Sequence, residues 1–251
     1  MYYIREGLGL RWLAVLFAAA AVAAGFAMGN LVQSSEIAGA AAHLWGLDRR
    51  ITGVLLMAFT AIAALGGMKR VGKISACLTP LMALLYVGAG GLVVVLRRED
   101  LPAALAAIFR GAFGWRAAAG GAAGWTLAAA LRQGLARGVF SNEAGLGTAS
   151  IVHASSSAEN PVEEGFWGIF EVFVDTMVIC TLTALAVLLS GGLETPGGLE
   201  AFPSAGAAAA SAFNALLPGG IGGVLLEICL LFFALSTILS WSGCGETCWR
   251  Y

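Results

Sequence analysis

Residues Gly138-Val-Phe-Ser-Asn-Glu-Ala-Gly-Leu-Gly-Thr148 decide how the rest of this sequence is interpreted. Apolar stretches flank them, yet this stretch contains Ser141, Asn142, Glu143 and three glycines. Inside a bilayer, irregular backbone is tolerated only where protein buries it or where it lines a cavity. An ionisable group near mid-membrane costs on the order of 2.5–3.5 kcal/mol. Two interpretations remain open: a broken helix whose half-helix ends hold a charged ligand, or a polar loop outside the membrane.

The composition indicates an integral membrane protein. Of the 251 residues, 59% are hydrophobic and only 12% are charged, whereas a soluble domain has about 25% charged residues. The formal net charge of −1 gives no sign of nucleic-acid binding. The five cysteines have no spacing typical of a metal site. We therefore expect an all-α membrane protein.

Hydropathy predicts six membrane segments, the fourth of them interrupted by the polar stretch. They cover Trp12 to about Ala42, Ile51–Met68, Ile74–Leu96, 117–158, Gly165–Leu189 and Ile221–Ser242. Residues Leu101–Gly114 are expected to form an interfacial or re-entrant helix, and 205–217 a short amphipathic helix. Lysine and arginine fall six against six on the two sides, so they do not fix the orientation.

Polar and aromatic residues share helix faces within three of these segments. They are spaced three or four residues apart: Asn30 and Gln33, Glu171 and Asp175, and Thr237 and Trp241. For Asn30 and Gln33 the residues alone favour hydrogen bonding between helices, and a ligand-binding face is the alternative.

Four stretches, in order along the chain, resemble the alanine or glycine:cation symporter family. They are Met1–Gly9, Gly138–Ala154, Val172–Thr176 and Phe233–Trp241. The family belongs to the amino acid–polyamine–organocation superfamily. The resemblance therefore implies a LeuT-type inverted repeat of five plus five helices, whose first and sixth helices are broken. The six segments are similar to helices three to eight, with Gly138–Thr148 as the break in the sixth.

The resemblance also implies that this sequence is a fragment. In the family a Gly-Gly-Pro precedes the position of Met1, and a Gly-Thr-Gly-Asn motif lies on helix one. We therefore expect residues 1–251 to form a single transmembrane domain that is part of a longer transporter.

Candidate site residues are assigned by the same resemblance, position by position. Four side chains resemble those that contact the amino acid: Gln33, Phe140, Thr237 and Trp241. The candidate cation ligands are Ser141, Asn142, Glu143, Asp175, Thr176 and Ser236, with Thr237 shared. Glu143 either ligates the cation or accepts N–H groups of the unwound backbone. Oxygen ligands of these kinds suit a hard cation such as Na⁺.

The expected function is Na⁺- or H⁺-coupled symport of alanine or glycine by a multi-pass protein of the cytoplasmic membrane. We expect that the protein is not an enzyme and that it has no cofactor beyond its coupling ion. We expect the backbone to lose helical hydrogen bonding between Phe140 and Gly147. We also expect Gln33 and Thr237 to point toward residues 140–145.

Two alternatives come from other classes of protein. The first is a truncated remnant without transport activity. The second is an intramembrane hydrolase that uses Ser141, Glu143 and His153. Against the second, the sequence lacks both Gly-x-Ser-x-Gly and His-Glu-x-x-His.

Overall fold

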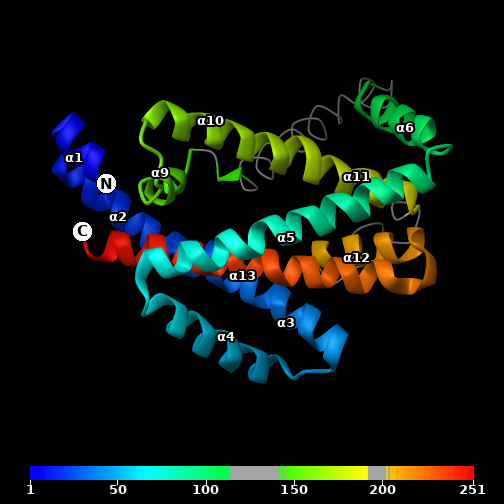
Figure 1. The fold of residues 1–251 in the computed structure, drawn as a ribbon, viewed down its shortest axis with the longest axis horizontal. Helices are drawn as coiled ribbons and strands as arrows, with labels where there is room; N and C mark the ends of the chain where they lie inside the picture. The colour runs from blue at the N-terminus through cyan, green and yellow to red at the C-terminus, as the bar shows by residue number, and fades with distance from the viewer. Residues whose placement is uncertain (114–141, 144, 192–201, 203) are drawn as a thin grey trace, which may run out of the picture. The chain divides into compact units, whose positions relative to one another are not determined.

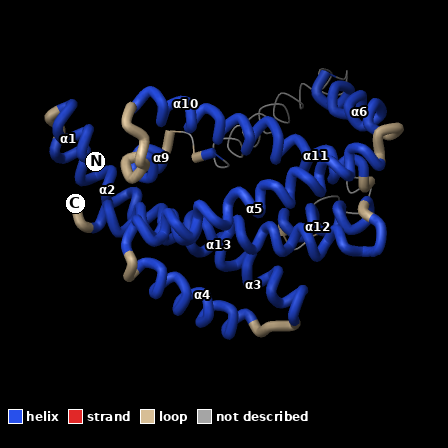
Figure 2. Tube along the Cα trace, in the orientation of Figure 1, coloured by secondary structure: helices blue, strands red, loops and turns tan. Residues whose placement is uncertain are grey.

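The computed structural model describes residues 1–113, 142–143, 145–191, 202 and 204–251. Every regular element within these residues is a helix, as expected (Figure 1, Figure 2). The contacts divide the chain into two compact units. The first unit contains Met1–Leu85, Thr148–Ser157 and Leu225–Tyr251, and the second contains Tyr86–Gly147 and Ala158–Val224. The single transmembrane domain expected from the sequence stays a prediction.

The first unit consists of the N-terminal helices, a short central helix and most of the last helix. Its elements are α1 (Tyr2–Leu8), α2 (Arg11–Ala24), η1 (Gly25–Leu31), α3 (Val32–Trp45), α4 (Arg49–Ala64), the first part of α5 (Gly67–Leu96), α9 (Thr148–His153) and α13 (Ile221–Trp249) from Leu225 onward. The side chain of Asp48 caps α4 by accepting a hydrogen bond from the amide of Arg50 at 2.7 Å.

Buried apolar side chains of α13 pack against the other helices of the first unit. Ile37 of α3 clusters with Ala234 and Ile238. Ala63 and Val71 cluster with Leu239. The last helix is thus the common partner of α3, α4 and α5 within this unit.

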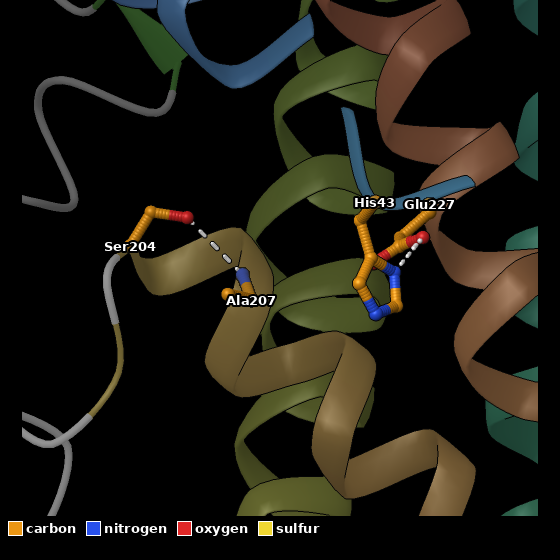
Figure 3. A network of polar contacts seen from close by, with 4 residues as sticks. All are labelled: His43, Ser204, Ala207 and Glu227. Atoms are coloured by element: carbon orange, nitrogen blue, oxygen red, sulfur yellow. Dashed lines mark hydrogen bonds and ion pairs between the residues drawn. The ribbon is translucent and has the colours of Figure 1, made fainter. Parts of the chain in front are cut away.

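The second unit consists of the remaining part of α5 and the helices that follow it. Its elements are α6 (Leu101–Phe113), α10 (Pro161–Val172), η2 (Phe173–Ile179), α11 (Cys180–Leu189), α12 (Ala205–Leu216) and η4 (Pro218–Gly220). Asn160 caps α10 by accepting a hydrogen bond from the amide of Val162 at 2.8 Å. Ser204 caps α12 in the same way, by accepting from the amide of Ala207 at 3.2 Å (Figure 3).

The core of the second unit forms around α12. Phe213 is fully buried, and its ring lies 5.8 Å from the ring of Tyr86 on α5. The hydroxyl of Tyr86 also hydrogen-bonds the hydroxyl of Thr183 on α11. The structure confirms the predicted helices over Leu101–Gly114 and 205–217, as α6 and α12.

Four helical stretches in the described part of the chain are long and apolar enough to cross a membrane. They are Arg11–Trp45, Arg70–Leu96, Pro161–Leu189 and Pro218–Trp249, and they match four of the six predicted segments. Large apolar side chains such as Trp12, Phe26 and Phe166 are more than half exposed on them. Lipid hydrocarbon solvates such a surface, and contiguous apolar exposure of this kind marks a membrane or interaction surface.

The second predicted segment, Ile51–Met68, is wrong in its length. The structure has a 16-residue helix there, Arg49–Ala64, which spans about 24 Å at 1.5 Å per residue. That is shorter than the roughly 30 Å hydrocarbon core. The chain turns at Leu65 and Gly66, and α5 begins at Gly67. Met68 therefore belongs to the next helix, because the glycines end the apolar stretch earlier than hydropathy indicates.

The predicted loss of helical backbone between Phe140 and Gly147 is confirmed on the residues that the structure describes. Asn142 is helical, Glu143 and Gly145 lie in turns, and regular helix resumes at Thr148. Glu143, Gly145 and Gly147 have φ angles of 54°, 80° and 79°. This left-handed region suits glycine but is uncommon for glutamate. Most of the predicted segment 117–158 lies outside the described residues.

Two of the long helices contain a π-helical turn, which the sequence analysis did not predict. One is η1, between α2 and α3, and the other is η2, between α10 and α11. A π-helical turn inserts an extra residue into an α-helix and is frequent at functional sites. Both turns contain or adjoin residues that the sequence had singled out.

Candidate functional site

The predicted site residues fall into two groups, one in each unit. Phe140 and Ser141 lie outside the described residues. The first unit contains Gln33, Ser236, Thr237 and Trp241, and the second contains Asn142, Glu143, Asp175 and Thr176. The expected orientation of Gln33 and Thr237 toward residues 140–145 stays a prediction, because it joins residues of different units.

The first group is built around η1, against which Trp241 packs. Gly25 and Gly29 are one helical turn apart on this element, and both are buried. A Cβ atom placed on Gly29 would lie 2.3 Å from Cγ of Trp241, and one on Gly25 would lie 3.4 Å from Cε3. Trp241 is only 5% exposed. The two glycines therefore form a surface without side chains on which the indole ring packs. We call this contact between Gly25, Gly29 and Trp241 the seat.

Contacts on both sides of Gln33 give its position relative to α13. Gly29 meets Trp241 one turn before Gln33, and Ile37 meets Ala234 and Ile238 one turn after it. Residues four apart share a helix face. Gln33 lies between these two contacts along the chain. Its orientation toward Thr237 stays a prediction.

The two hydroxyls of α13 bond to their own helix. Ser236 and Thr237 both donate to the carbonyl oxygen of Phe233, each at 2.9 Å. These bonds use the hydroxyl protons and leave oxygen lone pairs that can accept a hydrogen bond or ligate a cation.

An ion pair that the sequence analysis missed joins the same two helices. Nδ1 of His43, near the end of α3, lies 2.8 and 2.9 Å from the carboxylate oxygens of Glu227 (Figure 3). Glu227 is buried, while the His43 side chain is 76% exposed. In the sequence, Glu227 stands out as an acidic residue within an apolar segment. Nothing in the sequence pattern identifies His43 as its partner.

Asn30, in η1, differs from its expected role. Its Oδ1 atom is buried and has no hydrogen-bond partner in the structure, so this oxygen does not form the bond between helices that the sequence favoured. A buried carbonyl oxygen without a partner is costly.

The second group is built around η2. Asn142 donates from Nδ2 to the hydroxyl oxygen of Thr176 at 3.2 Å. Two candidate cation ligands far apart in the sequence are therefore in contact. Asp175 and Thr176 lie in the middle of the π-helical turn, and all three side chains are half-buried.

The backbone of η2 departs from the α-helical pattern next to this group. The amide of Cys180 donates to the carbonyl of Asp175, five residues earlier. In an α-helix this amide would pair with the carbonyl of Thr176. The hydroxyl oxygen of Thr176 and the amide oxygen of Asn142 are ligands of the kind that hard cations prefer.

The described residues contain no group of three or more His, Cys, Asp or Glu side chains placed to hold a metal ion.

Comparison with known proteins identifies the family of this chain. The sequence model of the sodium:alanine symporter family matches residues 1–251. The chain is 40% identical over 255 residues to the sodium/alanine symporter AgcS of Methanococcus maripaludis, covering 100% of this chain and 54% of AgcS. It is 36% identical over 246 residues to the probable sodium/glutamine symporter GlnT of Bacillus subtilis, covering 98% and 49%.

An uncharacterized transporter of Haemophilus influenzae is 38% identical over 253 residues, which cover 100% of this chain and 54% of that protein. The chain thus spans about half the length of the curated relatives it matches.

Proposed function

Because this chain belongs to the sodium:alanine symporter family, we propose that it carries the substrate and cation contacts of a cation-coupled amino-acid symporter in the cell membrane. It acts as part of a longer chain, with Na⁺ as the coupling ion and alanine or glycine as the substrate. Transport proceeds by alternating access without covalent chemistry, so the protein is not an enzyme.

The observation that carries this proposal is the packing of η1 and α3 against α13. Gly25 and Gly29 meet Trp241, and Ile37 meets Ala234 and Ile238, which supports an amide at Gln33, a hydroxyl at Thr237 and an apolar wall at Trp241 as the substrate contacts. Gln33 and Thr237 offer hydrogen bonds to the polar end of an amino acid. The indole ring limits the space for its side chain.

A small substrate is favoured over a large one by the volume of Trp241. Family membership alone does not decide this question, because one relative is named for alanine and another for glutamine. A buried ring at the end of a pocket selects by size, at about 1–3 kcal/mol per methylene group. We therefore propose glycine and alanine ahead of glutamine.

The coupling cation is held by the second group, centred on the contact between Asn142 and Thr176. Ser141, Glu143 and Asp175 are further candidates, and Ser236 and Thr237 are candidates for a second cation. Neutral oxygen donors favour Na⁺, whereas proton coupling needs a carboxylate that changes its charge. Because Glu143 and Asp175 are carboxylates, H⁺ is the alternative coupling ion.

A chimera of AgcS tests the proposal. The matching 255-residue segment of AgcS is replaced by residues 1–251, because the two align over the whole of this chain. The purified chimera is reconstituted in proteoliposomes, and uptake of radiolabelled alanine is measured with and without a Na⁺ gradient. Unmodified AgcS is the positive control.

We expect Na⁺-driven alanine uptake that unlabelled glycine inhibits more strongly than glutamine does. A monodisperse chimera that shows no uptake of any of the three amino acids would overturn the proposed function. Uptake that is driven by a pH gradient and does not depend on Na⁺ would show that the coupling ion is H⁺. Cleavage of a chromogenic ester by the 251-residue chain, lost in Ser141→Ala, would favour the hydrolase instead.

A further inference from the structure

We propose that Gly29 is a specificity-determining position, because it sets the distance between η1 and α13 through its direct contact with Trp241. The inference rests on the proposed function, in which Trp241 closes the substrate pocket. Gly29 touches no substrate itself and acts as a positioning residue.

The contact involves the root of the tryptophan side chain. A Cβ atom on Gly29 would lie 2.3 Å from Cγ, 2.6 Å from Cβ and 2.6 Å from Cδ2 of Trp241. Atoms without a covalent bond do not approach this closely. Cβ and Cγ lie beside the backbone, so rotating the indole ring does not move Cβ away. A methyl group at position 29 is accommodated only if η1 and α13 separate.

At Gly25, one turn before Gly29, the distance between η1 and the Trp241 side chain is larger. A Cβ atom there would lie 3.4 Å from Cε3 and 3.8 Å from the carbonyl oxygen of Trp241. These are tight but ordinary van der Waals distances. The seat is therefore narrowest at Gly29 and wider one turn earlier.

Separation of the two helices changes the site because Gln33 and Thr237 lie one turn from this contact. Gln33 follows Gly29 by four residues, and Thr237 precedes Trp241 by four. The absence of a side chain at position 29 thus keeps both polar contacts close together. Moving the helices apart widens the pocket, loosens the grip on a small amino acid and admits a larger one.

General helix packing offers a simpler explanation, since small residues commonly allow membrane helices to approach. Gly39 is the control for a glycine-to-alanine change that meets no neighbour, and the background that lacks the Trp241 side chain separates the two explanations. It lies in α3, and a Cβ atom placed on it has no heavy atom within 4 Å. Gly39→Ala makes the same chemical change on the same helix pair without touching Trp241.

The first experiment tests the seat itself, on the 251-residue chain in detergent, and needs no transport activity. The protein is labelled with 5-fluorotryptophan, and the ¹⁹F resonance of Trp241 is assigned by its loss in Trp241→Phe. We expect Gly29→Ala to shift this resonance, Gly25→Ala to shift it less, and Gly39→Ala to leave it unchanged. An unchanged Trp241 resonance in Gly29→Ala would contradict the close contact between Gly29 and Trp241.

The second experiment tests specificity, in the AgcS chimera. We expect Gly29→Ala to weaken alanine uptake and to improve competition by methionine relative to glycine by about tenfold, the lower end of discrimination by one methylene group. Gly39→Ala should keep the original competition profile. In a Trp241→Gly background, which also lacks Cβ, Gly29→Ala should change that profile much less, because every side-chain atom of the clash is gone.

The outcomes separate the two proposals. No uptake by the unmodified chimera overturns the proposed function and the specificity role with it, while the ¹⁹F spectra still decide on the seat. A shifted resonance with an unchanged competition profile overturns the specificity role alone. Where Gly29→Ala fails to fold, the Gly29→Ala/Trp241→Gly double variant takes its place: recovered folding supports the contact, and a double variant that still fails to fold overturns it.

Discussion

The two π-helical turns interrupt two long apolar helices in the same way, yet their surroundings differ. In η1, Gly25 and Gly29 are buried and Trp241 packs on them. In η2 no residue is buried, and the polar Asp175 and Thr176 are half-buried beside Asn142. The same backbone irregularity therefore supports a close apolar contact in one place and a group of oxygen donors in the other.

This difference follows from what each turn presents to its neighbour. A π-helical turn with glycines exposes backbone that a large ring can approach closely. A turn with hydroxyl and carboxylate groups offers oxygen atoms to its surroundings. We infer that η1 governs the size of the substrate and that η2 governs the cation. Substitutions in one turn should therefore leave the property governed by the other unchanged.

The largest effect is expected from Asn142→Ala, which removes one side of the contact in η2. Removing a group that ligates or orients a bound metal ion typically lowers the affinity for the ion about 10–100-fold, so the Na⁺ concentration for half-maximal uptake should rise by that factor. Uptake of every substrate should fall, while the order of competitors stays the same. The measurement is a Na⁺ titration of alanine uptake in the chimera.

Thr176 provides the matched control for this change. Thr176→Val removes the hydroxyl and should act like Asn142→Ala, whereas Thr176→Ser keeps the hydroxyl and should be close to the unmodified chimera. Equal Na⁺ responses in all of these variants would remove η2 from the cation site. An altered competitor order would show that the two turns are not independent.

A smaller effect is expected from Trp241→Ala, on the other side of the comparison. Removing the ring opens the end of the pocket, so alanine uptake should weaken and competition by leucine or methionine should improve about tenfold. The Na⁺ dependence should not change. Competition assays with each amino acid check the first expectation, and an unaltered profile would remove Trp241 from the pocket.

The smallest effect is expected from His43→Ala, which breaks the ion pair with Glu227. Because the His43 side chain is largely exposed, water replaces much of the lost interaction, and the stability should fall by about 1 kcal/mol. That corresponds to a decrease in Tm of about 2–4 °C. Thermal unfolding of the 251-residue chain in detergent measures it.

Glu227→Gln is the control for the ion pair, because it removes the charge but keeps an oxygen that can accept a hydrogen bond. It should lower the Tm less than His43→Ala does. Neither variant should change the order of competitors in the chimera. A changed order would mean that the whole length of α3 and α13, rather than the seat at Gly29, sets the pocket.

Much of the fold could be predicted from the sequence because the free energy of membrane insertion depends on local composition. Arg11–Trp45 and Pro161–Leu189 match predicted segments closely. The break near Glu143 was also predictable, since glycines and polar groups together disfavour regular helix in a membrane. Hydropathy failed at the end of α4, where Leu65 and Gly66 turn the chain while the sequence is still apolar.

The residue types of the site were visible in the sequence, as were their helix faces. Thr237 and Trp241 are four residues apart, and any α-helix places them on one face. Their partners could not be found in this way. Gly29 meets Trp241, His43 meets Glu227 and Asn142 meets Thr176 only because helices far apart in the sequence pack together.

The sequence by itself determined which segments are apolar helices, where helical backbone breaks and which family the chain resembles. Tertiary structure alone decided where the π-helical turns occur and what they hold. The reason is that each turn meets its partner through a contact between segments far apart in the sequence. Trp241 packs on Gly29 of η1, and Asn142 donates a hydrogen bond to Thr176 of η2. A local pattern of residues contains no information about either partner.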